Sequence, residues 1–196
     1  HVDLITDSIQ WNYWLNGRVW MSDPDFLIVR GKDTSKEKIN NVLNPKENNP
    51  DPKGIEALWR RGSEFTYEEA RTWANIVLMS GGNVFLADRL SMLNEKGLYL
   101  IKKALTPTGQ SARPLDLCEN RKASYWHQKF GRQNRLAIIN WSECEKAFNF
   151  DFGDYELQPP DKLFDYWTDE PYTVSDGFIR ISLGSHESIL LFWMEE

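Results

Sequence analysis

The 196-residue sequence has few of the side chains that bind metal ions. It contains two cysteines, Cys118 and Cys144, and three histidines, His1, His127 and His186, and these positions lack the spacing of a zinc site. We therefore expect no metal and no cofactor. Spacing alone does not decide whether the two cysteines pair or stay free, so both states stay open.

Positive charge and long apolar runs are also scarce. The formal net charge is −6 and there is no basic run, which argues against a nucleic-acid partner. No apolar run is long enough to cross a membrane and no signal peptide is visible, so we expect no membrane partner. The sequence starts at His1 without an initiator methionine, which suggests a fragment or a processed piece. The compartment therefore stays open between extracellular, periplasmic and cytoplasmic.

Hydrophobic side chains are abundant. They make up 41% of the sequence, which is enough for a globular fold, and nine residues are tryptophan. Aromatic rings suit stacking against sugars, but we expect most of the tryptophans in the core.

Residues 20–30 combine two carboxylates, a proline and a continuous apolar segment. Residues 26–29 predict a strand that is buried on both faces, as in a parallel sheet covered by helices. Asp23 and Asp25 then lie at one end of this strand, and Pro24 restricts the backbone between them. The alternative is a polar strand edge with a turn proline.

The first half of the chain alternates between helix and strand patterns. Helices are predicted over about 1–19, 66–80 and 94–105, and short buried strands over about 21–29 and 84–87. The second helix has the clearest signals, because Thr66 and Glu69 have capping-box spacing and Gly81-Gly82 follows. Alternation of this kind indicates a parallel sheet with crossover helices, so Asp25 and Asp88, next to the two strands, are expected to face the same way.

Residues 31–63 form a long polar connection with closely spaced turn signals, among them Asn44-Pro45 and Asp51-Pro52. Long loops of this type are often lids or substrate walls. A solvated insertion is the alternative.

After Pro107 and Gly109 the periodicity changes to two, and Arg113-Pro114 marks a linker. Strands are predicted over 125–130, 135–141, 147–152, 162–167, 178–183 and 188–194. Glycine or proline turns separate these runs. Repeated short strands with turns between them predict an antiparallel β-sandwich.

Several motifs, in order, resemble the melibiase group of glycoside hydrolases, the α-galactosidases. The run Trp20-Met21-Ser22-Asp23-Pro24-Asp25 resembles the family motif Trp-x-Asn-Asp-Pro-Asp, and Gly81-Gly82 with Ala87-Asp88-Arg89-Leu90 resembles its Gly-Gly and Ser-Asp-Asp-Leu pair. The segments 137–141, 164–167 and 184–188 resemble the end of the family's sandwich. Ser22 and Arg89 depart from the pattern, where the family has an asparagine and a second aspartate.

The resemblance implies an α/β plus all-β architecture. Residues 1–110 would be the last strands and helices of a (β/α)8 TIM barrel, and residues 111–196 a C-terminal antiparallel β-sandwich. It further implies retaining hydrolysis of terminal α-linked galactose-type sugars, in which two nearby carboxylates act in turn. Both catalytic aspartates of the family lie on earlier strands, so we expect no catalytic residue in this chain. The implied partners are an α-linked oligosaccharide or glycoconjugate and the N-terminal part of the same enzyme, with a homo-oligomer as a further option.

Four residues are candidates for supporting roles. Asp25 is the best substrate-binding candidate, because the motif's second aspartate lies near the sugar in relatives and carboxylates bind hydroxyls well; a structural role is the alternative. Trp20 is a second substrate-binding candidate, which could stack on a sugar or pack the barrel rim. Asp23 is expected to accept backbone N–H groups around Pro24. Asp88 is expected to join loops at the barrel mouth.

Two other functions stay open: a non-catalytic carbohydrate-binding module, and a subunit-contact fragment whose sandwich docks on a barrel from another chain. The barrel-like first half counts against the binding module. The end of a barrel would leave a sheet edge and apolar faces without partners. We therefore expect residues 1–105 to be unstable without a partner.

Overall fold

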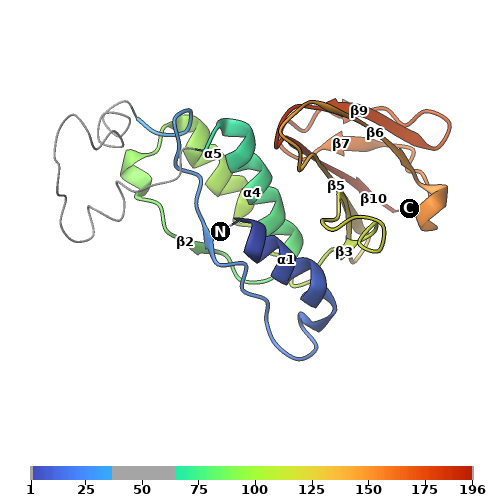
Figure 1. Cartoon of the computed structure of the whole chain (residues 1–196), viewed down its shortest axis with the longest axis horizontal. Coiled ribbons are helices and arrows are strands. Elements are labelled where there is room, and N and C mark those ends of the chain that lie inside the picture. The colour runs from blue at the N-terminus through green and yellow to red at the C-terminus, as the bar shows by residue number, and fades with distance from the viewer. Residues whose placement is uncertain (1, 37–64, 196) are drawn as a thin grey trace.

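The computed structural model describes residues 2–36 and 65–195, which form a helical part followed by a β-sandwich (Figure 1). From residue 37 to 64, the long connection predicted after the first strand lies outside the described residues. The prediction that it is a lid or a substrate wall is therefore not tested.

The helical part contains two short strands that pair in parallel. Its elements are α1 (Val2–Asn12), η1 (Tyr13–Leu15), β1 (Phe26–Leu27), α4 (Tyr67–Ser80), β2 (Phe85–Leu86), η2 (Leu90–Met92) and α5 (Glu95–Ala104). Phe26 lies opposite Phe85 and Leu27 opposite Leu86, so the predicted parallel pairing is confirmed. The first helix ends at Asn12, earlier than the predicted helix over 1–19.

Both strands are shorter and more exposed than the sequence predicts. Phe26 is 51% exposed and Phe85 45%, whereas Leu27 and Val29 are buried. The prediction of a strand buried on both faces is therefore wrong. Among the described residues α4 covers one side of β1, where the Trp73 indole N–H donates to the Phe26 carbonyl oxygen at 3.1 Å.

The helix α4 lies at the centre of the molecule, in contact with α1, α5, β1 and the sandwich (Figure 1). Its predicted capping box is confirmed, because the Thr66 hydroxyl accepts from the Glu69 N–H and the Glu69 carboxylate accepts from the Thr66 N–H. Gly81 ends the helix in the left-handed conformation, with φ of 66°. In α5, Ile101 and Ala104 are buried, whereas Leu98 is exposed.

The sandwich consists of a six-stranded and a two-stranded antiparallel sheet. The larger sheet has the order β3-β4-β5-β10-β7-β8, and β6 pairs with β9. The bounds are β3 (Arg113–Pro114), β4 (Tyr125–Phe130), β5 (Gln133–Ile139), β6 (Lys146–Asp151), β7 (Leu163–Asp165), β8 (Pro171–Tyr172), β9 (Phe178–Leu183) and β10 (Ser188–Met194). The predicted antiparallel sandwich is confirmed, although β3 lies where a linker was expected and β8 was not predicted.

Alternate residues of the central strands enter two different cores. Leu136 and Ile138 of β5 pack toward β6 and β9, in a cluster with Phe150 and Ile179. Ala137 and Ile139, their neighbours on the opposite face, belong to a second cluster that contains the buried apolar side chains of α4, among them Trp73. This second cluster joins residues on both sides of residue 110 into one continuous core. The division into residues 1–110 and 111–196 stays a prediction.

The tryptophans divide between core and surface. Trp73, Trp126, Trp167 and Trp193 are buried, while Trp11, Trp14 and Trp20 are exposed. Cys118 and Cys144 are both exposed and free in the structure.

Candidate functional site

The loop that precedes β1 holds Asp23 and Asp25 close together. The Asp25 N–H donates to Asp23 Oδ1 at 2.8 Å, which closes a turn around the buried Pro24. Asp25 has a φ of 64°, and its own Oδ1 accepts from the Phe26 N–H at 2.7 Å. This left-handed conformation is uncommon outside glycine, and aspartate is one of the residues that tolerate it. The local hydrogen bonds thus hold both carboxylates in a fixed loop.

A close approach to the end of α4 fixes the position of this loop. The Ser22 N–H donates to Asn16 Oδ1 at 2.7 Å, and the Asn83 N–H donates to the Ser22 carbonyl oxygen at 3.0 Å. Gly82 packs against Ser22 so closely that a Cβ at Gly82 would overlap the Ser22 carbonyl oxygen. The Gly81-Gly82 motif therefore sets the distance between α4 and the two carboxylates.

Asp88 lies at the other end of the strand pair. Its carboxylate is fully buried: Oδ2 accepts from the Val29 N–H at 2.6 Å and the Arg30 N–H at 3.1 Å, and Oδ1 pairs with Arg30 Nη1 at 2.7 Å. Asp88 thereby ties the segment after β2 to the segment after β1.

The structure does not bring the predicted site residues into one cluster. The expectation that Asp25 and Asp88 face the same way is wrong, because Asp25 precedes the paired residues of β1 and Asp88 follows those of β2. The physical reason is the parallel direction of the pair, because a residue that precedes one strand and a residue that follows the other lie at opposite ends of the pair. Trp20 is half exposed, and its carbonyl oxygen accepts from the Gly17 N–H at 2.8 Å.

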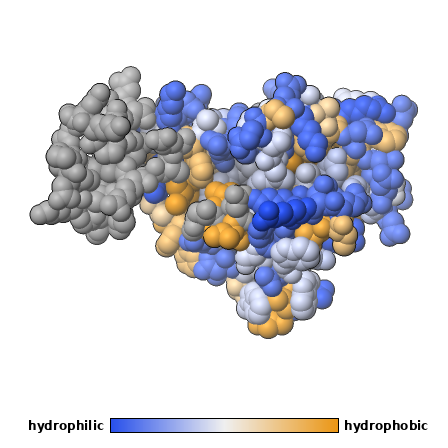
Figure 2. All heavy atoms as spheres, viewed as in Figure 1, coloured by the Kyte–Doolittle hydropathy of each residue, from blue (hydrophilic) through white to orange (hydrophobic). Residues whose placement is uncertain are grey.

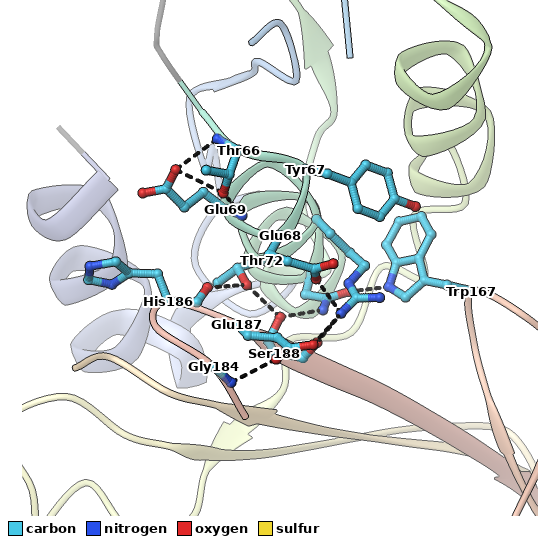
Figure 3. A network of polar contacts seen from close by, with 12 residues as sticks. Thr66, Tyr67, Glu68, Glu69, Thr72, Trp167, Gly184, His186, Glu187 and Ser188 are labelled. Atoms are coloured by element: carbon cyan, nitrogen blue, oxygen red, sulfur yellow. Dashed lines mark hydrogen bonds and ion pairs between the residues drawn. The ribbon is translucent and has the colours of Figure 1, made fainter. Parts of the chain in front are cut away.

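Sequence reasoning missed a buried polar network between α4 and β10 (Figure 3). Thr72 Oγ1 hydrogen-bonds to the His186 carbonyl oxygen at 2.8 Å and to Ser188 Oγ at 2.7 Å. Asn75 joins the same group, because its Nδ2 donates to Ser188 Oγ and its Oδ1 accepts from the Trp167 indole N–H. The residues of this network bond one another, so the network positions α4 on the sandwich. A helix pattern reveals apolar faces, and polar pairs from distant segments leave no such signal.

Charged residues extend this network toward solvent (Figure 3). Arg71 forms ion pairs with Glu68 and with Glu187, the second at 3.2 Å. Burial raises the pKa of Glu68, although Arg71 lowers it. The Glu187 carboxylate also accepts from the Gly184 N–H at 2.7 Å, which fixes the turn before β10.

Within residues 2–36 and 65–195, no group of three or more histidine, cysteine, aspartate or glutamate residues could hold a metal ion. In the same part of the chain, no helix has the length and apolar character needed to cross a membrane.

Neither a protein-family model nor a curated protein matches the sequence. Solved structures of glycoside hydrolases match its fold. A candidate α-galactosidase/melibiase from Bacteroides fragilis matches 97% of the chain with a TM-score of 0.71 and 13% identity. A GH27 β-L-arabinopyranosidase from Geobacillus stearothermophilus matches all of it with a TM-score of 0.70 and 19% identity. The α-galactosidase I of Mortierella vinacea matches 68% with a TM-score of 0.55 and 14% identity.

These matches define the fold of the chain. At identities of 13–19% they confirm the resemblance to melibiase-type hydrolases at the level of the fold. The chain spans 38%, 42% and 37% of the lengths of these three structures, which is less than half of each.

Proposed function

We propose that this chain is the C-terminal portion of a retaining α-galactosidase-like glycoside hydrolase. It would act on terminal α-linked galactose-type sugars, with the catalytic aspartate pair in a part of the enzyme upstream of these residues. The observation that carries the proposal is the match of 97–100% of the chain, at TM-scores of 0.70–0.71, to a candidate α-galactosidase/melibiase and a GH27 β-L-arabinopyranosidase. The proposed reaction needs no cofactor.

The parallel strand pair supports the assignment of residues 1–110 to the end of a (β/α)8 barrel. Within the described residues, β1 pairs only with β2, so each strand has one edge without a strand partner. Large apolar side chains are exposed on this pair, on α1 and η1, and in the loop before β1: Leu4, Trp11, Trp14, Val19, Met21, Phe26 and Phe85. On the face shown in Figure 2, hydrophobic residues also gather over the helical part, whereas the sandwich side is mostly hydrophilic. The missing strands of a barrel would cover such a surface, which makes the N-terminal part of the enzyme the partner we propose.

The candidate residues take supporting roles in this proposal. Asp25 would bind sugar hydroxyls, and the half-exposed Trp20 would offer a ring to the sugar face. Asp23 would hold the Asp25 backbone, and Asp88 would hold the segments after β1 and β2 together. A homo-oligomer is compatible with these roles.

Hydrolysis of a chromogenic α-galactoside tests the proposal. We expect no activity from the chain alone and activity when the upstream portion is present. Asp25→Asn should then lower kcat/KM by about tenfold or more, because a charge-assisted hydrogen bond to the sugar becomes a neutral one. Asparagine tolerates the left-handed backbone at this position, so the loop is expected to stay in place.

Asp176→Asn is the matched control for this variant. Asp176 is exposed in the sandwich and also has a positive φ, of 54°, so the same chemical change meets the same backbone conformation. Its activity should equal that of the wild type. Activity of the isolated chain would contradict the proposal, since it would require a catalytic pair within these residues. No activity in the mixture would favour a binding or subunit-contact role.

A further inference from the structure

A hollow of about 410 Å³ lies at one edge of the larger sheet, where β3 and β4 meet the segment over residues 155–157. Its volume falls within the range of about 300–1,000 Å³ that is usual for small-molecule sites. Polar and charged side chains dominate its lining, among them Arg113, His127, Lys129, Tyr155 and Glu156.

The strand residues and the segment residues of this hollow lie on the same side of the sheet. Tyr125, His127 and Lys129 alternate along β4 and therefore project from one face. Arg113 lies directly opposite His127 in the pairing of β3 with β4, so its side chain projects from that face too. The Tyr155 ring centroid lies 5.9 Å from that of Tyr125, which places the segment over this face. One ligand can therefore contact both walls of the hollow.

Two hydrogen-bond donors in the hollow have no acceptor within the described residues. Arg113 is exposed and forms neither an ion pair nor a side-chain hydrogen bond in this part of the chain. The Tyr155 hydroxyl has no hydrogen-bond partner there either. Burial, with a smaller contribution from Asp116, raises the pKa of Tyr155 to about 12, so the hydroxyl keeps its proton at neutral pH. Both groups can therefore donate to an oxygen of a ligand.

The strand wall carries a positive charge that no described acid neutralises. Lys129 forms an ion pair with Glu195 at 2.7 Å, whereas Arg113 has no such partner among the described residues. Burial lowers the pKa of His127 and a hydrogen bond to Asn134 raises it, while Arg113 and Lys129 lower it and Glu195 raises it. The wall therefore favours an anion, and the planar guanidinium of Arg113 matches the geometry of a carboxylate.

The wall formed by the segment favours hydroxyl groups instead. Glu156 follows η3 (Gly153–Tyr155) with a positive φ of 58°, and its exposed carboxylate can accept from a hydroxyl. A simple anion would gain at Arg113 but meet the like charge of Glu156. A ligand that places a carboxylate at Arg113 and hydroxyls at Tyr155 and Glu156 satisfies both walls.

We propose that this hollow binds a hydroxylated carboxylate of the size of a hexuronic acid, with Arg113 pairing with the carboxylate and with Tyr155 and Glu156 hydrogen-bonding to the hydroxyls. The proposal does not depend on the hydrolase assignment, because every residue that lines the hollow lies within residues 111–157.

Titration of the chain with galacturonic acid and with galactose, which lacks the carboxylate, tests the proposal. Binding is followed in ¹H–¹³C correlation spectra of the histidine rings, in which His127→Gln identifies the His127 signal by its disappearance. Galacturonic acid should shift this signal to saturation and bind about tenfold more tightly than galactose. Arg113→Gln should weaken its binding by about tenfold, and Tyr155→Phe by about threefold.

The pH dependence provides a second readout. A carboxylate bound beside His127 favours the protonated ring, so galacturonic acid should raise the pKa of His127, measured from its ring signals. By linkage, the affinity should increase by about threefold as the pH falls from 7.5 to 5.5, a range in which a carboxylate of ordinary pKa, about 4, stays ionised. His127→Gln should bind equally at both pH values.

Arg180→Gln is the matched control, because Arg180 is exposed on β9 and outside the hollow. It should bind galacturonic acid as the wild type does. The proposal is overturned if galacturonic acid does not bind, if galactose binds as tightly, if Arg113→Gln binds as tightly as Arg180→Gln, or if the bound ligand leaves the pKa of His127 unchanged. None of these outcomes depends on hydrolysis, so the site fails or stands separately from the proposed enzyme activity.

Discussion

Replacing Gly82 with alanine should lower the free energy of unfolding by about 3 kcal/mol, because a methyl group has no space at this position. The added Cβ would overlap the Ser22 carbonyl oxygen, which belongs to the backbone and cannot rotate away. Relief requires the loop before β1 to move from the end of α4. The hydrogen bond from the Asn83 N–H to Ser22 would then lengthen or break, and Asp23 and Asp25 would move with the loop. The change in the urea unfolding midpoint measures this effect.

Gly153→Ala is a suitable control for Gly82→Ala. A Cβ at Gly153 would meet only the Asp151 carboxylate, at 3.2 Å, and a flexible side chain can adjust. Its midpoint should stay close to that of the wild type. If Gly82→Ala unfolds at the same urea concentration as Gly153→Ala, the close approach between Gly82 and Ser22 does not exist in solution.

The second large effect is expected at Asp88. Asp88→Asn keeps the size of the side chain but removes the charge that faces the Arg30 guanidinium and two backbone N–H groups. The Asp88 side chain is fully buried and that of Arg30 is 11% exposed, so water replaces little of the lost interaction. We expect a loss of about 3 kcal/mol in the free energy of unfolding.

Asp169→Asn makes the same change at an exposed ion pair. Asp169 pairs with Lys103 at 2.9 Å, its side chain is 67% exposed, and its positive φ of 60° suits asparagine. This variant should lose less than about 1 kcal/mol. Equal losses for the two variants, measured by urea unfolding, would show that burial of the Asp88–Arg30 pair does not matter.

Local signals in the sequence predicted the elements whose stability is decided locally. The capping box at Thr66 and Glu69, the glycine end of α4, and the strands β4, β9 and β10 all follow from short-range patterns. Burial was predicted less well, because Phe26 and Phe85 are apolar and yet exposed. An apolar residue indicates that burial would be favourable, but the neighbouring sequence does not show whether another segment buries it.

In the candidate site, too, the features set by neighbouring residues were predicted and those set by distant segments were not. The Asp23 turn around Pro24 depends on neighbouring residues and could be anticipated. The opposite placement of Asp25 and Asp88 depends on where β1 begins, where β2 ends and the parallel direction of their pairing, which joins segments about 60 residues apart. The polar network of Thr72, Asn75 and Ser188 gave no signal, because its members come from segments more than 110 residues apart.

The continuous core that crosses residue 110 limits how this sandwich can be used in evolution or in engineering. If the sandwich were transferred to another protein without α4, its strands β5 and β10 would expose Ala137, Ile139 and Leu190 to water. The polar side chain of Ser188 would then lose its partners on α4. The sandwich is therefore not an interchangeable module. It can be exchanged between proteins only together with the helix that covers it, so recombination is expected to preserve α4 and the sandwich as one inherited unit.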